Sequence, residues 1–409
     1  MFSRDRWREI FETIRKNKLR TFLTGFAVAL GIFIFVVLVG FSNGLNNTFR
    51  EFFLDDATNT LFLFAGKTSE PYKGFKSNRI IEWENSDLDD IKKNFPFFLE
   101  YITPRITRSM LVKYKGESNN YTSRAVSPAH QFAEKTIMMK GRYLNQDDIN
   151  DRTKNIVIGR LVAKDLFKSE DPIGKYVDMG GIAWKVIGVF QDDGGDNEER
   201  YIYLPYTTRQ LIEKNNDKLG QIIVAFKPEL GHAGAMAFEK SLMRFLKDKK
   251  NIAPTDQNAI FIRNVADQLK QNQQFSNVLK YIFATIAIGT LVFGMIGVGT
   301  IMLFVVKERT KELGVRKALG ATPKAIINMI LHEAIFITTI AGYLGLILGI
   351  VLLSTVGEKL DDFFIKNPYI DLGTAITATI LLISFGALAG YIPAKRAASI
   401  KPIVALRDE

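Results

Sequence analysis

The chain has 409 residues with 47% hydrophobic content, and its mean hydropathy is +0.04. Such averages fit a soluble protein of two or three domains, but they conceal four long stretches without any Asp, Glu, Lys or Arg. The formal net charge of +11 is concentrated outside residues 50–280, which carry 35 basic and 31 acidic side chains. This distribution excludes a strong electrostatic footprint for nucleic acid, and the absence of Cys excludes disulfides and thiolate chemistry.

The N-terminal residues 1–20 are basic and amphipathic, and we predict a cytoplasmic helix on the inner leaflet. Its apolar face consists of Trp7, Ile10, Phe11 and Ile14. The following stretch, 21–49, has no charged residue and exceeds the roughly 20 residues that a helix needs to cross the hydrocarbon core. It is too long for the apolar region of a signal peptide, and no small-residue cleavage pattern follows it. We therefore predict a retained transmembrane helix at 21–43.

The segment 44–276 is predicted to be a folded α+β domain outside the cytoplasm, with two subdomains. Expected strands are 58–65, 106–114, 155–159, 184–190 and 201–204, and expected helices are 87–95 and 233–249. Polar helix formers from 265 to 277 run directly into the next apolar stretch. This continuity predicts a helical stalk near 265–280.

Three patterns in the chain resemble sites and are interpreted otherwise. Gly66-Lys67-Thr68 lacks the earlier Gly of a phosphate-binding loop, because Leu61 occupies that position. The acidic run 192–199 lacks the spacing of an EF-hand, so a solvated turn is favoured over a calcium site. The histidines form no ligand-spaced motif and are expected to be ordinary surface or interface residues: His130, His232 and His332. No catalytic motif is present, so no metal or cofactor site is predicted in this chain.

Three further apolar stretches predict transmembrane helices at 277–306, 323–357 and 372–394. Basic residues are retained on the cytoplasmic side of short loops. Residues 1–20 carry seven Lys or Arg, residues 307–324 carry six and the tail 395–409 carries four. The loop 358–371 has two basic and four acidic residues, so it is expected outside, whereas both termini and the loop after the second helix are expected in the cytoplasm.

The cytoplasmic segment 307–322 combines charge with small residues on a predicted helix. One face carries charged side chains, Glu308, Arg309, Glu312 and Arg316, and the opposite face carries small ones, Thr310, Gly314, Ala318 and Ala321. Glu312 and Arg316 form a favourable i,i+4 pair, and Thr322 and Pro323 can open the next helix. Glu333 is expected at the membrane interface near His332. The alternative is an ordinary basic loop that only obeys the charge rule.

The run from Glu308 to Ala321, followed by Glu333-Ala334 and a Gly-rich helix, resembles the signature of MacB/FtsX-type (type VII) ABC transporter permeases. Matching motifs extend along the chain: Lys16-Asn17-Lys18-Leu19-Arg20-Thr21, Gly141-Arg142-Tyr143, Asn155-Ile156-Val157-Ile158-Gly159, Asp171-Pro172-Ile173-Gly174-Lys175 and Pro393-Ala394-Lys395-Arg396. The resemblance implies four transmembrane helices, a large domain between the first two, and a cytoplasmic coupling helix that docks on an ATPase. By this analogy the ATPase contacts are Glu308, Arg309, Lys311, Glu312, Leu313, Gly314, Arg316, Lys317, Ala318, Gly320 and Ala321.

The resemblance further implies a non-catalytic subunit in the bacterial inner membrane that pairs with a second permease, identical or different, and with a separate ABC ATPase. No fused ATPase domain is present in this sequence, so ATP and Mg²⁺ are expected on that partner. The implied work is mechanical coupling that exports or extracts an amphiphilic substrate such as a peptide, antibiotic or lipoprotein. The alternative is an FtsX-like subunit that signals to an external cell-wall hydrolase. A periplasmic adaptor and an outer-membrane channel are compatible further partners that the sequence leaves open.

Small residues in the apolar stretches favour close helix contacts within the membrane. Gly345 and Gly349, and likewise Gly386 and Gly390, have the spacing that lets two backbones approach. The sequence leaves open whether these contacts lie within one subunit or between two, and contacts within one subunit are favoured. The first apolar stretch offers its own small residues for dimerisation: Gly25, Ala29 and Gly31.

Overall fold

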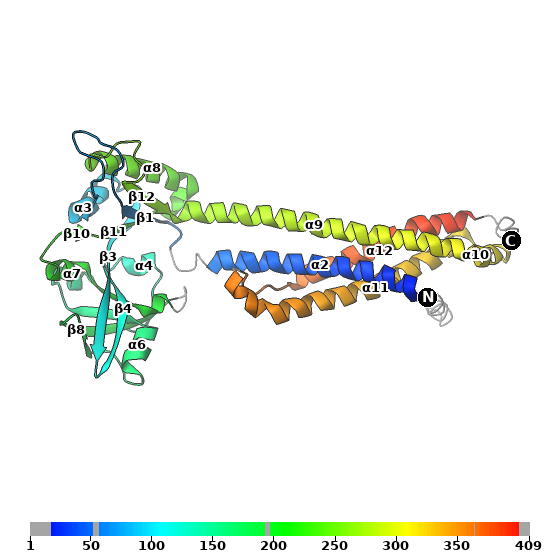
Figure 1. Cartoon of the computed structure of the whole chain (residues 1–409), viewed down its shortest axis with the longest axis horizontal. Helices are drawn as coiled ribbons and strands as arrows, with labels where there is room; N and C mark the ends of the chain where they lie inside the picture. Colours follow the sequence, from blue (N-terminus) through cyan, green and yellow to red (C-terminus); the bar gives the residue numbers. More distant parts are fainter. Residues whose placement is uncertain (1–17, 52–56, 193–196, 364, 401–409) are drawn as a thin grey trace. The chain divides into compact units, whose positions relative to one another are not determined.

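The computed structural model describes residues 18–51, 57–192, 197–363 and 365–400. The chain divides into two compact units (Figure 1). We call Arg50–Gln273 the β-rich unit, and Met1–Phe49 together with Gln274–Glu409 the helical unit. The amphipathic helix predicted at 1–20 lies outside the described residues, except for its last three positions.

The β-rich unit is organised around one ten-stranded mixed sheet, in the order β12-β1-β11-β3-β4-β9-β6-β8-β5, with β7 pairing β3 and β8. Its strands are β1 Thr60–Ala65, β3 Leu99–Tyr114, β4 Glu117–Val126, β5 Ile137–Gly141, β6 Asn155–Gly159, β7 Tyr176–Met179, β8 Ala183–Gln191, β9 Tyr201–Pro205, β11 Gln221–Phe226 and β12 Ile260–Asn264. The two-residue turn Lys115-Gly116 joins β3 to β4 with φ of 43° and 90°. Two positive φ angles are the signature of a type I′ turn, which matches the twist of a hairpin.

Helices pack against this sheet, and the longest of them, α8, does so through an apolar stripe. They are α3 Asn85–Asn94, α4 His130–Ala133, α5 Gln146–Asn150, α6 Arg160–Phe167, α7 Tyr206–Ile212 and α8 Gly231–Lys249. The stripe on α8 is fully buried at Ala235, Phe238, Leu242 and Leu246. Phe238 stacks on Phe98 with ring centroids 5.1 Å apart. Each large side chain buried in this way contributes about 1.5–3 kcal/mol to folding.

His130 departs from the expectation that it is an ordinary surface or interface residue. Its exposed fraction is 0%, so that prediction is wrong. The ring packs edge-on against Tyr203 at 5.1 Å, and Nδ1 lies 3.3 Å from the Tyr143 hydroxyl. The sequence gives no sign of this environment, because α4 is only four residues long and shows no periodicity.

The helical unit contains the four apolar helices expected to cross a membrane. They are α2 Lys18–Glu51, α9 Val265–Glu308, α11 Pro323–Val356 and α12 Leu372–Ser399, with the short η3 Gly357–Phe363 after α11. α9 is continuous over 44 residues, and so it includes the segment predicted as a stalk as well as the second apolar stretch. Its first residues belong to the β-rich unit and the rest to the helical unit.

The four glycines chosen from the sequence all face neighbouring helices of the same chain. A Cβ on Gly345 would lie 2.2 Å from the Ala29 carbonyl oxygen on α2, and a Cβ on Gly349 would lie 2.3 Å from Val36. On α12, a Cβ on Gly386 would meet the Thr338 hydroxyl at 2.2 Å and one on Gly390 would meet Ala334 at 2.7 Å, both on α11. These glycines therefore allow α11 to pack closely between α2 and α12.

The small residues of α2 are also used inside the chain. A Cβ on Gly31 would lie 3.2 Å from the Thr290 carbonyl oxygen on α9, and Ala29 is the residue that Gly345 contacts. A Cβ on Gly25 would lie 3.6 Å from Ala341. The residues proposed from the sequence for dimerisation through the first span are thus already packed against α9 and α11.

Candidate functional site

The candidate coupling segment forms α10, Thr310–Ala318, which is separated from α9 by the single residue Arg309. The sequence predicted an unbroken helix from 307, so this interruption is a correction. The Thr310 hydroxyl donates to the carbonyl oxygens of Lys307 at 2.7 Å and Val306 at 3.2 Å. Hydroxyl groups that bond back to the preceding turn distort helices, which accounts for the interruption at Arg309.

A chain of ion pairs fixes the start of α10 to α11. Arg309 contacts Glu312 with two bonds of 2.9 Å and reaches Glu333 on α11 at 3.2 Å. Arg316 binds the same Glu312 at 2.9 Å. The side chain of Arg309 is 15% exposed and that of Glu333 is 7% exposed, whereas that of Glu312 is 43% exposed. The Arg309–Glu333 pair is therefore the shielded part of this chain of ion pairs, where loss of one partner costs most.

One face of α10 is buried against the ends of the long helices. Leu313 is 1% exposed and Gly314 is also buried. Leu313 belongs to an apolar cluster formed by Val306, Ile326, Ile330, Ala394 and Ala397. Because this cluster draws on α9, α11 and α12 together, α10 is packed onto three helices at once.

Lys317 ties the other end of α10 to α12. Its ammonium donates to the carbonyl oxygens of Ala398 at 2.8 Å and Ile400 at 2.7 Å. The last carbonyls of a helix have no partner within it and carry partial negative charge, so a cation is favourable there. The contact satisfies two backbone acceptors and joins α10 to the C-terminal end of α12.

α10 ends in a tight turn that leads directly into α11. Gly320 has φ of +97° and donates to the Lys317 carbonyl at 3.1 Å, and Ala321 donates to the Arg316 carbonyl at 3.0 Å. This pair of bonds is a Schellman motif, for which a left-handed Gly is the usual residue. Thr322 then caps α11 by accepting from the Ala325 amide at 3.3 Å. The predicted N-cap at Thr322 is therefore confirmed.

A second buried charged cluster lies in the β-rich unit around Glu134. Arg105 contacts its Oε1, while Arg124 lies 2.6 Å and the Tyr203 hydroxyl 2.9 Å from Oε2. Burial opposes ionisation of Glu134, but the positive charges of Arg124 and Arg105 and the hydrogen bond from Tyr203 outweigh it and lower its pKa to about 2. Burial lowers the pKa of His130 to about 3, so this imidazole is neutral. The cluster connects β3, β4, β9 and α4.

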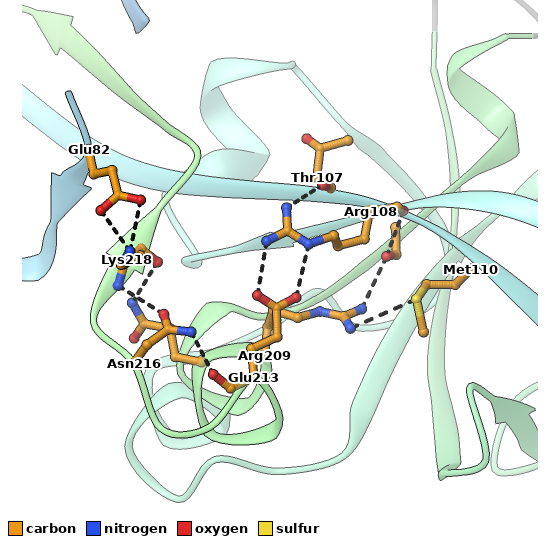
Figure 2. Close-up of polar contacts among 10 residues, drawn as sticks. Glu82, Thr107, Arg108, Met110, Arg209, Glu213, Asn216 and Lys218 are labelled. Atoms are coloured by element: carbon orange, nitrogen blue, oxygen red, sulfur yellow. Dashed lines mark hydrogen bonds and ion pairs between the residues drawn. The ribbon is translucent and has the colours of Figure 1, made fainter. Parts of the chain in front are cut away.

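A more exposed set of polar contacts fastens α7 to β3 in the same unit (Figure 2). Arg108 and Glu213 form a bidentate pair with distances of 3.0 and 2.9 Å. Their side chains are 48% and 28% exposed. Arg209 is 3% exposed and donates to the Ser123 hydroxyl at 3.2 Å. The Arg108–Glu213 pair is therefore a more exposed ion pair with which the buried pairs of Glu134 can be compared.

Comparison with known proteins places the chain in a family. A sequence model of the MacB-like periplasmic core domain matches residues 21–235, and one of the FtsX-like permease C-terminal region matches residues 284–402. The first match alone covers more than half of the chain. The chain belongs to the MacB/FtsX-like permease family of ABC transporters. The β-rich unit is thus the extracytoplasmic domain of a multi-pass permease, inserted between its first and second spans.

Two curated relatives illustrate the similarity. The macrolide export ATP-binding/permease protein MacB of Mannheimia succiniciproducens is 29% identical over 417 residues, which cover 100% of this chain and 62% of that protein. The protein of the same name from Bartonella henselae is 28% identical over 414 residues, covering 98% and 60%. The permease chain therefore spans about 60% of the length of these relatives. A crystal structure of the periplasmic region of MacB from Actinobacillus actinomycetemcomitans aligns at 24% identity with a TM-score of 0.44, covering 54% of this chain and 94% of that chain.

The predicted coupling residues of this permease divide between two faces. Those turned inward or half-buried are Arg309, Leu313, Gly314, Arg316, Lys317 and Ala321, and those exposed are Glu308, Lys311, Glu312, Ala318 and Gly320. Two exposed apolar residues were not selected from the sequence, Val315 at 44% and Leu319 at 84% exposure. Sequence reasoning also missed that Glu333 pairs with Arg309. The available signal was an acid within an apolar helix, which requires a cation nearby.

Proposed function

We propose that this permease is the membrane subunit of an ABC transporter in which α10 is the coupling helix and a separate ABC ATPase docks on it. The two-sided character of α10 carries the proposal. Its inner face is fixed by Leu313, the Arg309–Glu333 pair and Lys317, and its outer face presents Lys311 and Leu319. A helix held on one face and exposed on the other can receive a partner without losing its own position.

The proposed orientation places α10 and both termini in the cytoplasm. Six Lys or Arg in residues 307–324 support it, since basic residues are retained on that side. The proposal assigns ATP and Mg²⁺ to the ATPase partner, and the ATP-binding/permease names of the two relatives support a role for ATP in the assembly. The assembly we propose contains two permease chains and two ATPase subunits, in which ATP-driven closure moves the extracytoplasmic domain.

Docking is tested on the exposed face of α10. The variant Lys311→Glu with Leu319→Ser is purified as the full chain, and its binding to the ATPase encoded nearby is measured together with ATP hydrolysis. We expect at least a tenfold weaker affinity and loss of permease-stimulated hydrolysis, because exposed apolar and charged anchors concentrate binding energy. Thermal unfolding should be nearly unchanged, since surface substitutions shift stability by about 0.5 kcal/mol or less.

The control is Lys359→Glu, which makes the same charge reversal on an exposed side chain beyond the opposite end of α11. It should leave ATPase binding intact. If the double variant binds the ATPase and stimulates hydrolysis as the wild type does, the assignment of α10 as the docking helix is rejected.

The proposed cargo is an amphiphilic molecule captured on the extracytoplasmic side, such as a peptide, antibiotic or lipoprotein. The support is that both relatives described above carry the name of macrolide exporters. In proteoliposomes with the ATPase, we expect a macrolide or a lipopeptide to stimulate hydrolysis and to be moved. Recovery of a cell-wall hydrolase bound to the extracytoplasmic domain, without stimulation by any such molecule, would instead favour a signalling role.

A further inference from the structure

An open groove runs between the end of α9, the start of α10 and the end of α12, on the outside of the helical unit. Its volume is about 400 Å³, within the range of small-molecule sites. Its lining includes Thr300, Leu303, Phe304, Lys307, Thr310 and Arg396. All of them lie within the helical unit.

The groove is apolar at one end and cationic at the other. Thr300, Leu303, Phe304 and Lys307 follow the i, i+3, i+4, i+7 spacing that places residues on one helix face. With a rise of 1.5 Å per residue, Lys307 lies roughly 10 Å along the helix from Thr300. The apolar part of this face therefore extends along α9 into its membrane-spanning length, and the ammonium stands at its end.

The hydrogen-bond donors available in the groove belong to its two cations. Thr300 donates its hydroxyl to the Ile296 carbonyl at 2.8 Å, and Thr310 donates to the carbonyls of Lys307 and Val306. Among the described residues that line the groove there is no Asp or Glu, and neither Lys307 nor Arg396 forms an ion pair with a described carboxylate. Both side chains are exposed. The groove thus offers positive charge without a counter-ion from the part of the chain that the structure describes.

We propose that this groove binds an anionic phospholipid, with its phosphate between Lys307 and Arg396 and an acyl chain along Leu303 and Phe304. A lipid fits because it combines a negative headgroup with an apolar chain that continues toward the middle of the bilayer, in the direction of the apolar α9 face. Phe304 is 58% exposed and presents that apolar surface. Basic sites between spans on the cytoplasmic side attract anionic headgroups. The inference rests on the proposed orientation, which places this end of α9 at the cytoplasmic leaflet.

The site would also reach the coupling segment. Lys307 is the second-last residue of α9, and Thr310 is the first residue of α10. A headgroup held there would contact both sides of the interruption at Arg309. The lipid would thereby help to fix α10 relative to α9 and α12.

The test uses the full chain in nanodiscs that contain equal amounts of phosphatidylglycerol and phosphatidylcholine, with retained lipids counted by native mass spectrometry. The wild type should retain phosphatidylglycerol selectively. The variant Lys307→Ala with Arg396→Ala should lose this preference by roughly thirtyfold, because each cation near an anionic lipid contributes a factor of about five. The swap Lys307→Arg with Arg396→Lys should keep it. If the alanine variant is not recovered as a monodisperse protein, Lys307→Gln with Arg396→Gln is measured instead, with the same expected loss.

The matched control is Lys311→Ala with Lys324→Ala, which removes two exposed cations that do not line the groove. It should retain the selectivity. The proposal is overturned if the wild type shows no preference, if the groove variant keeps it, or if the control loses it to the same extent. Displacement of the lipid by millimolar inorganic phosphate would identify a phosphate site instead, and a changed oligomeric state in the same spectra would identify an interface between copies. No ATPase is present in this experiment, so its failure is separate from failure of the docking proposal.

Discussion

The β-rich unit and the helical unit use charged side chains in different ways. Inside the sheet, Glu134 is surrounded by two arginines and a tyrosine, and its side chain is 3% exposed. In the helical unit the described ion pairs lie at the end of the helices, and Glu312 remains 43% exposed. Between those ends the long helices pack through buried apolar side chains and close contacts at glycines. The buried ion pairs of Glu134 fix one arrangement of the strands. The ion pairs at the end of the helices include the exposed Glu312, which remains accessible to a partner.

The largest effect is expected from Glu134→Gln. It would leave Arg105 and Arg124 without their carboxylate, and breaking a buried pair in this way costs about 3–5 kcal/mol. Chemical unfolding of the full chain, followed by the fluorescence of Trp83 and Trp184, measures this loss. The matched control is Glu213→Gln, which breaks the more exposed bidentate pair with Arg108 and should cost about 1 kcal/mol or less. Equal losses in both variants would contradict the contrast between a buried and a surface network.

Acid should destabilise the β-rich unit in two steps. The folded-state pKa of His130 lies at about 3, below its ordinary value of 6.5, so between these values only the unfolded chain binds the proton and stability falls as pH decreases. The pKa of Glu134 is lowered from 4.5 to about 2, so its contribution is lost as pH falls from 4.5. Each step has a slope of at most about 1.4 kcal/mol per pH unit.

His130→Asn should flatten the decline between pH 6.5 and 4.5, where Glu134 is still ionised. Unfolding free energies measured across pH for this variant and the wild type would reveal the change. A decline that persists unchanged in His130→Asn would assign it to other groups.

The packing of the helical unit is tested by Gly345→Ala. The new methyl group would collide with the Ala29 backbone oxygen, and overpacking of this kind costs about 1–3 kcal/mol. Thermal unfolding in detergent should shift accordingly. A Cβ added to Gly289 on α9 would have no neighbouring atom within 4 Å, so Gly289→Ala should be neutral or stabilising. If both substitutions behaved alike, close contact between α2 and α11 would not be what holds this unit.

A smaller effect than at Glu134 is expected at the Arg309–Glu333 pair. A double-mutant cycle of Arg309→Ala and Glu333→Ala should give a coupling energy of about 1–2 kcal/mol, because Arg309 keeps its second partner Glu312 when Glu333 is removed. The same variants should lose a larger fraction of their stimulation of ATP hydrolysis than of their free energy of unfolding. A coupling energy near zero would mean that α10 is held by Lys317 and by Leu313 with its apolar neighbours, without a contribution from this pair.

The four spans could be predicted because each is a long run without charge, a signal that depends only on composition. Strands with apolar runs, such as Asn155–Gly159, were also predictable. β4, Glu117–Val126, was not predicted, since its first four residues are polar and exposed and it pairs as one arm of a hairpin. Its register is set by the turn at Lys115 and Gly116 and by the neighbouring strands rather than by its own periodicity.

At the coupling segment the sequence predicted a charged helix but placed some of its residues on the wrong side. A helical wheel assumes one unbroken helix, whereas α9 ends at Glu308 and α10 begins at Thr310, so one wheel does not describe both. Lys317 looks like any basic loop residue until the end of α12, 81 positions later in the chain, is brought beside it. Such pairings depend on tertiary contacts and have no local signature.

The turn from Leu319 to Thr322 has a mechanical consequence. A flexible linker between α10 and α11 would change its conformation when α10 moved, and the two helices could then move independently. Here the backbone amides of Gly320 and Ala321 are both bonded to the preceding turn, and Thr322 already caps the next helix. The joint is therefore held by hydrogen bonds on both sides, which restricts movement of α10 relative to the start of α11.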